Sequence, residues 1–399
     1  MSAITSSGTA RAARLGFTAT LAICAAFGLL AWGFSLWFFR IAPLQDWMVF
    51  YEAARAYFAG NLPLIFDGNA LTAALNQRFA GWLGAPLGLH PWVYPPPFLL
   101  LILPFGLLPP VASAAAFLLL GLAAAVAVVW RSLEPVQRWP AIATLLLCPA
   151  VPFDVMTGQN AFYTAALLVG AFAAMAEAPV LSGVLIGLLS LKPQLALMAW
   201  VALIAARRWR VLAAAVMTGG VLVLASIVVF GLDLWQAWAG LVLGGGDTYR
   251  SWIDVGRLNG ISVYACASWL GLPPVAASLT QAIATLGSAA LIYTIYRRPG
   301  PAGLRLAALL AAAILAAPHA SNSDAILLGL AAAIFVTSLP RETLQPYQLA
   351  VAAAVWISPL FNPPVLFRAG CATPLLVAVL LGAMVIAMRR QRLSAAAAR

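Results

Sequence analysis

Long, unbroken apolar stretches run through almost the whole chain, separated by short segments that hold arginine, proline or glycine. A transmembrane helix needs about 20 apolar residues, although a helix buried inside a protein can be shorter. Strands of an outer-membrane barrel would instead alternate apolar and polar side chains, and that alternation is missing here. The pattern predicts about twelve membrane-spanning helices, near 15–39, 111–130, 140–156, 158–177, 180–191, 193–206, 211–231, 274–296, 303–319, 322–339, 345–358 and 372–388.

One apolar stretch, 95–108, does not fit this series. It follows Tyr94, begins with three consecutive prolines and contains Pro104. Proline removes a backbone donor and clashes with the preceding turn, so a re-entrant or broken helix is expected rather than a clean span. The stretches 180–191 and 193–206 are also short for spans, which leaves the count open in this region.

Arginine clusters in the short loops set the expected orientation. Basic residues favour the cytoplasmic side, which places both termini inside and leaves two longer external segments, about 40–94 and 232–273. Within the first segment, apolar residues recur at helical spacing over 46–60 and 70–84, which predicts two amphipathic helices in the membrane interface. The basic clusters assigned to the cytoplasm are Arg11/Arg14, Arg131/Arg138, Arg207/Arg208/Arg210, Arg297/Arg298/Arg305, Arg341 and Arg389/Arg390/Arg392.

Composition excludes a soluble fold, because 64% of the 399 residues are hydrophobic and only 8% are charged. The predicted class is an all-α polytopic integral membrane protein with a single transmembrane domain over 1–399. A net charge of +11 would suggest nucleic acid for a soluble protein, but here it reports orientation, and no nucleic-acid partner is expected. The four cysteines show no metal-ligand or redox spacing.

Motifs for several other chemistries are missing from the sequence. It contains no D-x-D pair, no G-x-x-x-x-G-K-[ST] loop, no H-E-x-x-H and no G-x-S-x-G. ATP-driven pumping and hydrolysis by a serine nucleophile are therefore excluded, and neither a metal nor a cofactor is expected.

Polar residues gather near the external edge of the predicted spans, and every aspartate falls on that side. Ionisable groups at membrane depth are costly, so they usually face a cavity and mark a functional path. The residues at this edge are Asp46, His90, Tyr94, Asp154, Gln159, Asn160, Lys192, Asn259, His319, Asn322 and Asp324.

Each of these residues also has a purely structural interpretation. Lys192, the single lysine, precedes a helix-breaking proline and can meet an anionic group, or it can extend toward lipid head groups. Asp46 starts the first interfacial helix and can act as its cap. His319 ends a predicted span and can titrate, donate a hydrogen bond or only pack. His90, beside aromatic and proline residues, is interpreted as interfacial structure.

Four stretches, spread over about 10–340, resemble the GT-C fold glycosyltransferases that depend on polyprenyl phosphate. Within that fold they are most similar to glycosyltransferase family 87, which includes bacterial mannosyltransferases. Each motif is short, and their order along the chain carries the resemblance. They are Gln45-Asp46 with Tyr51 to Ala54 and Ala59-Gly60; Tyr94 to Phe98; Gly158-Gln159-Asn160 with Leu191-Lys192-Pro193; and Pro318-His319 through Asp324.

The resemblance implies a GT-C-like architecture and transfer of a sugar, mannose above all, from a polyprenyl-phosphate donor. The acceptor would be a hydroxyl of a glycolipid or glycan at the outer face of the bacterial inner membrane, and transfer would invert the anomeric centre without a metal. Asp46 matches the catalytic aspartate and would be the general base. His319 is a second catalytic candidate. The sugar, the linkage and the acceptor stay open.

The same resemblance suggests which residues bind the substrates. Lys192 and Arg257 would hold the donor phosphate, because both carry a positive charge. The further substrate-binding candidates are Tyr94, Gln159, Asn160, Asn259 and Asp324.

Two other functions compete with a glycosyltransferase. A secondary transporter or lipid flippase would also hold polar residues within helices, but near the bilayer midplane rather than at one edge. A non-catalytic subunit of an assembly is the third possibility. A test for sugar transfer from polyprenyl-phosphate sugars distinguishes them.

Overall fold

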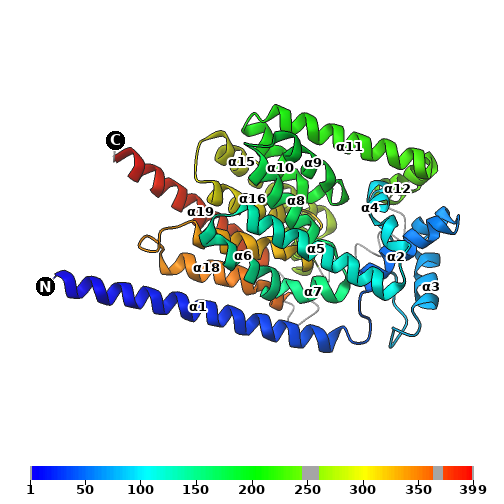
Figure 1. Cartoon of the computed structure of the whole chain (residues 1–399), viewed down its shortest axis with the longest axis horizontal. Coiled ribbons are helices and arrows are strands. Elements are labelled where there is room, and N and C mark those ends of the chain that lie inside the picture. Colours follow the sequence, from blue (N-terminus) through cyan, green and yellow to red (C-terminus); the bar gives the residue numbers. More distant parts are fainter. Residues whose placement is uncertain (1, 245–259, 363–371, 398–399) are drawn as a thin grey trace.

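The computed structural model describes residues 2–244, 260–362 and 372–397, and helices make up most of them (Figure 1). In these residues the strand-like pairing is limited to one isolated bridge between Gly260 and Ser321. The expected all-helical class is confirmed. The α-helices are α1 (Ser2–Phe38), α2 (Gln45–Phe58), α3 (Gly68–Arg78), α4 (Pro96–Gly106), α5 (Pro110–Ser132), α6 (Pro135–Leu147), α7 (Ala150–Thr157), α8 (Ala161–Ala174), α9 (Pro179–Leu188), α10 (Pro193–Ala205), α11 (Trp209–Phe230), α12 (Leu232–Gly244), α14 (Val263–Trp269), α15 (Pro274–Arg297), α16 (Ala302–Ala316), α17 (Ile326–Thr337), α18 (Pro346–Ile357) and α19 (Ala372–Ala397).

Four short 3-10 helices join these elements. They are η1 (Leu62–Phe66), η2 (Leu189–Leu191), η3 (Ser323–Ala325) and η4 (Ser358–Phe361). Two of them, η2 and η3, lie directly beside polar residues of the predicted site.

Five described helices are long and apolar enough to cross a membrane: α5, α11, α15, and the parts Gly16–Phe38 of α1 and Ala372–Leu393 of α19. The helices α6 and α7, bent by 51° at their junction, would form a sixth span. Each predicted apolar stretch falls on one helix, except 140–156, which is divided between α6 and α7, and several of these helices are shorter than a span. The protein is therefore multi-pass, and the count of twelve stays a prediction.

The span-length helices face outward with apolar side chains. Only 17% of the apolar window of α11 is buried, and Val228 on its outer face is 84% exposed. A contiguous exposed apolar surface of this kind fits contact with lipid. On its inner side, α11 packs closely on α9: a side chain at Gly183 would lie 2.4 Å from Ala214, and one at Gly187 would lie 2.5 Å from Thr218. Small residues four apart let two membrane helices approach in this way.

The centre of the molecule is built from α16 and α17, whose side chains are almost all buried. Around them lie α6, α10, α15, α18 and α19. Alanine fills much of the contact surface of α16, which keeps the neighbouring backbones close. The fully buried alanines of this helix are Ala307, Ala308, Ala311, Ala312, Ala313 and Ala316.

Several of the basic clusters lie together at one end of the molecule. In Figure 1 both labelled termini lie at the left, whereas α2, α3 and α12 lie at the right. Arg341 stacks over the ring of Phe17 near the start of α1, 5.4 Å from its centroid. Arg207 follows α10 and Arg297 ends α15, yet both line the same pocket. The predicted grouping of arginines on one side therefore agrees with the arrangement of the helices.

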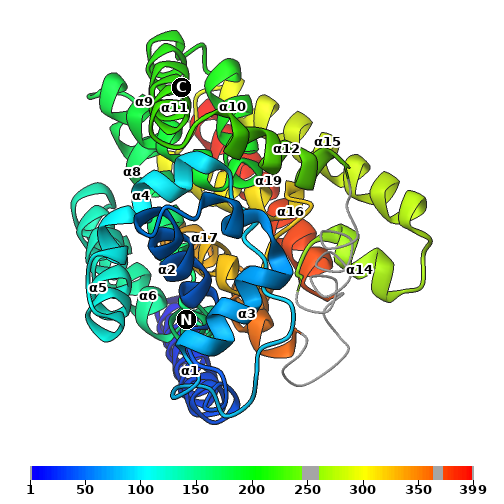
Figure 2. The ribbon, with the colours of Figure 1, turned by 90° about the vertical axis from the view of Figure 1, so that its right-hand side faces the viewer.

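The opposite end is formed by the segment 40–94, which faces the viewer in Figure 2. Its two predicted helices are present as α2 and α3. However, nine of the fourteen residues of α2 are buried, because the helix packs against α3 and α4 rather than lying flat on the surface. The helix α4 has eleven residues, about 16 Å, and is too short for a full span, as its prolines predicted.

Candidate functional site

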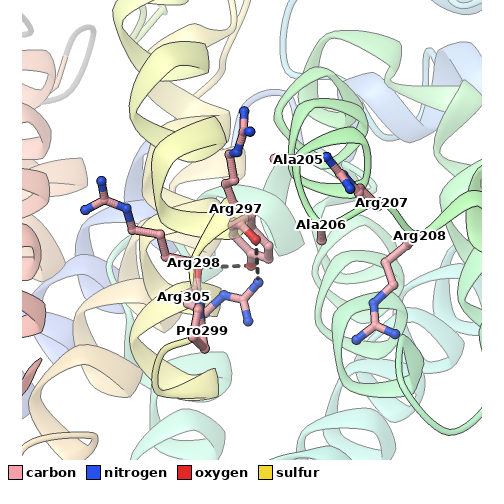
Figure 3. A pocket seen from close by; sticks show the side chains of 9 residues that line it. Ala205, Ala206, Arg207, Arg208, Arg297, Arg298, Pro299 and Arg305 are labelled. Carbon is pink, nitrogen blue, oxygen red and sulfur yellow. Dashed lines mark hydrogen bonds between the residues drawn. The ribbon is translucent and has the colours of Figure 1, made fainter. Parts of the chain in front are cut away.

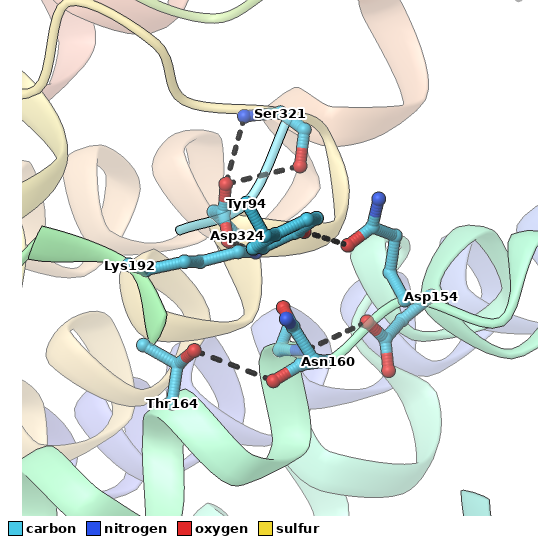
Figure 4. Close-up of polar contacts among 9 residues, drawn as sticks. Tyr94, Asp154, Asn160, Thr164, Lys192, Ser321 and Asp324 are labelled. Carbon is cyan, nitrogen blue, oxygen red and sulfur yellow. Dashed lines mark hydrogen bonds and ion pairs between the residues drawn. The ribbon is translucent and has the colours of Figure 1, made fainter. Parts of the chain in front are cut away.

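Polar residues from five separate segments meet between α2 and the core helices. They come from positions where a helix begins, ends or breaks, because backbone and side chains there are free of the regular helical pattern. Figure 4 shows several of them pointing toward one another. The segments supply Asp46 from the start of α2, Tyr94 before α4, Asp154 and Gln159 from the end of α7, Lys192 between η2 and α10, and Asp324 in η3.

The strongest contact in this group is a buried ion pair. The Lys192 Nζ lies 2.6 Å from Asp324 Oδ1, and the two side chains are only 5% and 3% exposed. The other carboxylate oxygen of Asp324 accepts hydrogen bonds from the backbone N–H and the hydroxyl of Ser321, at 2.9 and 3.0 Å. Both carboxylate oxygens are thus satisfied, which a buried charge requires.

Local sequence explains why Lys192 reaches this place. Pro193 occupies the first position of α10, and the chain leaves η2 in a non-helical conformation at Lys192, with φ of −135° and ψ of 71°. A proline is favourable at the start of a helix and forbids the α conformation in the residue before it. The break therefore projects the ammonium into the site instead of continuing the helix.

Tyr94 and Gln159 connect the start of α4 to the end of α7. The Tyr94 hydroxyl donates a hydrogen bond to Gln159 Oε1 at 3.1 Å. Burial raises the pKa of Tyr94 to about 12, so its phenol stays a hydrogen-bond donor at neutral pH. Gln159 also interacts with the Asp46 carboxylate, as does Thr157.

Asp46 is partly exposed, whereas the next eight residues of α2 are buried. Burial by the surrounding protein raises the pKa of Asp46 above its usual value, and this effect is larger than the combined effect of four neighbouring side chains that lower the pKa. The positive charges of His90 and Lys192, with the side chains of Gln159 and Thr157, lower its pKa. A carboxylate with a raised pKa accepts a proton more readily near neutral pH, which is the property of a general base.

Two buried side chains in the site have polar atoms without hydrogen-bond partners. Asp154 Oδ1 accepts from the backbone N–H of Ala161 at 3.0 Å, but its Oδ2 has no partner. Neither polar atom of the Asn160 amide makes a hydrogen bond of regular geometry, although Asn160 is only 1% exposed and its amide lies close enough to the Tyr94 phenol to act on it. A buried polar atom left unpaired costs about 1–3 kcal/mol of folding free energy. A ligand or water that hydrogen-bonds to these atoms would recover that free energy.

The structure brings together six of the nine predicted site residues: Asp46, Tyr94, Gln159, Asn160, Lys192 and Asp324. Arg257 and Asn259 lie outside the described residues. His319 is exposed in the turn between α16 and η3, and the imidazole whose charge acts on Asp46 is that of His90.

His90 was interpreted from the sequence as interfacial structure, and its electrostatic link to Asp46 was missed. Its backbone N–H donates to the Thr72 hydroxyl at 2.9 Å, and this hydrogen bond holds the loop between α3 and α4 against α3. The available signal was its position, four residues before Tyr94, in a segment already expected near the site. Asp154 and Thr157 were likewise not assigned to the site.

A metal centre has no evident ligands in the described part of the chain. No group of three or more histidine, cysteine, aspartate or glutamate side chains could hold an ion there. Lys192 supplies a permanent positive charge in this site, which suits an anionic group such as a phosphate.

Comparison with known proteins gives one match. A family model described as glycosyltransferase family 87 matches residues 92–318, which is more than half of the chain. The matched part includes Tyr94, Gln159, Asn160 and Lys192; it begins after Asp46 and ends one residue before His319. The search of curated proteins and the search of solved structures gave no significant match.

A tight backbone contact places Asp46 against the end of α7. Gly158 ends that helix with φ of +75°, and a side chain there would lie 2.3 Å from the Trp47 Cβ. The backbone N–H of Leu44, itself left-handed with φ of 58°, donates to the Met156 carbonyl at 2.6 Å. The start of α2 is thus held on the turn that presents Gln159.

Replacing Gly158 by alanine should separate these two elements. The left-handed backbone and the overlap with Trp47 together cost roughly 2–4 kcal/mol. We expect Gly158→Ala to lower the thermal unfolding midpoint of the purified protein. Gly219→Ala is the matched control, because no atom lies within 4 Å of the added carbon in the middle of α11. Equal midpoints for the two variants would contradict this account of the contact.

Proposed function

The chain belongs to glycosyltransferase family 87 and is therefore a membrane glycosyltransferase, and we propose that its donor is a sugar linked to polyprenyl phosphate. The proposed sugar is mannose, and the proposed acceptor is a hydroxyl of a glycolipid or glycan. Family membership favours transfer over the transporter alternative. The apolar outer faces of the span-length helices support a donor that reaches the site from the lipid phase.

The observation that carries the mechanism is the position of Asp46. The residue is partly exposed, its carboxylate has a raised pKa, and it lies in the same polar group as Lys192. In the proposed reaction the acceptor oxygen attacks the anomeric carbon while the bond from that carbon to the phosphate oxygen breaks. Asp46 takes the acceptor proton, the phosphate leaves with the bonding electrons, and the anomeric centre inverts. No step needs a metal.

Lys192 is proposed to neutralise the leaving phosphate. The Lys192 ammonium has three N–H groups, and one of them donates to Asp324. The other two remain for the phosphate of the sugar donor if that phosphate approaches from the side of Asp46. Arg257 is proposed as the second phosphate ligand and His319 as a second catalytic group. The buried amide of Asn160, with Tyr94, Gln159, Asn259 and Asp324, is proposed to bind substrate hydroxyls.

The proposed location is the bacterial inner membrane, with Asp46 on the outer face. This orientation is supported by the basic clusters, which lie at the end of the molecule opposite α2. Arginine-rich short loops favour the cytoplasm, and that preference assigns the opposite end to the exterior.

The role of Asp46 is tested by Asp46→Asn, which keeps size and shape but cannot take a proton. We expect sugar transfer from a polyprenyl-phosphate donor to fall by at least about 10²-fold, with normal expression. Asp67→Asn is the matched control, because Asp67 caps α3 by accepting from the Ala70 N–H and asparagine caps nearly as well. A residual rate above about a tenth of wild type in Asp46→Asn would reject the general-base role.

His90→Gln tests the electrostatics of Asp46. Protonated His90 lowers the Asp46 pKa, so removing that charge should raise it further. The active form is the carboxylate, whose population is lost as pH falls through its pKa. We expect the acidic limb of the kcat/KM profile to lie above the usual aspartate range and to move to higher pH in His90→Gln. The limb of the wild-type protein is the reference, and an unmoved limb in His90→Gln, or one at lower pH, contradicts the assignment.

Orientation is tested with single cysteines at exposed positions of the two ends. Ala59→Cys lies after α2, and Glu134→Cys lies between α5 and α6 without removing an arginine. An impermeant thiol reagent should label position 59 and not position 134 in intact cells, with the wild-type chain as the blank. The reverse pattern would place the site in the cytoplasm.

A further inference from the structure

A second polar site lies far from Asp46, where five arginines line a cavity of about 380 Å³ (Figure 3). Arg207 and Arg208 come from the turn between α10 and α11. Arg297 and Arg298 come from the end of α15, and Arg305 comes from the first turn of α16. Three separate segments therefore contribute arginines to the lining of one hollow.

This cavity and the Asp46 site lie at opposite ends of α11. The helix begins directly after Arg208, and its last residue, Phe230, packs edge-on against Tyr57 of α2 with ring centroids 5.3 Å apart. Its 22 residues span about 33 Å. The arginine cavity is thus separate from the transfer site and belongs to the other membrane face.

Arg305 is fixed in place, yet it is not fully satisfied. Its guanidinium stacks on the Tyr296 ring, 4.3 Å from the centroid, and Nη2 donates to the Tyr296 carbonyl at 3.3 Å. Its Nε is buried and has no hydrogen-bond partner. The side chain is therefore held rigidly beside the cavity with one buried donor unpaired, as expected of a preformed anion ligand.

The cavity holds positive charge without a counter-ion from the described chain. No acidic residue lines it, and the ion pairs found in the described residues, Arg78–Glu52 and Lys192–Asp324, lie elsewhere. The charges of Arg208 and Arg392 also act on Arg305. Arginine stays protonated, so these groups repel one another until an anion neutralises them.

The chemistry and the position of the cavity identify the kind of anion. Guanidinium groups match phosphate oxygens in bidentate geometry, and the volume suits a head group rather than a whole lipid. Trp209, next to Arg208, is 62% exposed, and Tyr293 stacks with Arg297 on the outer surface. Tryptophan and tyrosine are enriched where the membrane meets water.

We propose that this cavity binds a phosphate group at the membrane face opposite the transfer site. An anionic phospholipid head group and a soluble phosphorylated molecule share this chemistry. Basic pockets between membrane helices on the cytoplasmic side bind anionic head groups. The exposed Trp209 indicates that the arginine cavity lies at the depth of the lipid head groups.

The test uses the purified full-length protein in detergent and follows its thermal unfolding midpoint. Phosphatidylglycerol should raise the midpoint more than phosphatidylcholine at equal concentration, and high salt should reduce the difference. In Arg208→Gln/Arg298→Gln, half of the shift should require at least about tenfold more phosphatidylglycerol, because two charged donors are lost. Arg305 is left unchanged, since it packs on Tyr296.

The matched control is Arg131→Gln/Arg389→Gln, which removes two exposed arginines at the same end but outside the cavity, and it should respond as wild type. Inorganic phosphate distinguishes the sources. A shift with phosphate that the cavity variant loses supports a soluble ligand, and a shift with phosphatidylglycerol alone supports a lipid. The proposal is overturned if neither raises the midpoint, if the cavity variant responds as wild type, or if the control loses as much.

Discussion

The buried ion pair between Lys192 and Asp324 is the contact on which the arrangement of the site depends. A charge in an apolar interior is tolerated only when its partner is held in place, and losing one partner leaves the other uncompensated. The pair joins the break before α10 to the turn after α16, 132 residues apart in the chain. The same two charges act on Tyr94, so the electrostatics of the site follow from where this pair is anchored.

The helix α2 completes the site because it is docked rather than free. Trp47 packs against Gly158, stacks near Trp82 and contacts Phe79, and these contacts set the position of the preceding residue, Asp46. Further along α2, a side chain at Gly106 would lie 2.6 Å from the Ala54 Cβ. Close backbone contacts at both ends therefore fix the carboxylate more firmly than a surface helix would.

The sequence predicted the helices well, because long apolar runs and prolines act locally. It also grouped Asp46, Tyr94, Lys192 and Asp324, since polar residues at the ends of apolar runs share one depth. The pairing of Lys192 with Asp324 could not be predicted, because any of several acidic groups at that depth would serve an ammonium. The electrostatic link between His90 and Asp46 could not be predicted for a related reason: the depth of His90 follows from the sequence, but the direction in which its loop turns depends on tertiary contacts.

The alanine-rich surface of α16 has a consequence for how this fold can change. Alanine loses no side-chain rotamers on burial, so the central contacts gain packing at little entropic cost. A larger side chain would force the neighbouring backbones apart, and glycine would weaken the helix itself. These positions therefore tolerate neither a larger nor a smaller side chain, whereas the lipid-facing residues of α11 need only stay apolar. Over evolutionary time, sequence drift should therefore concentrate on the outer wall while the centre stays nearly constant.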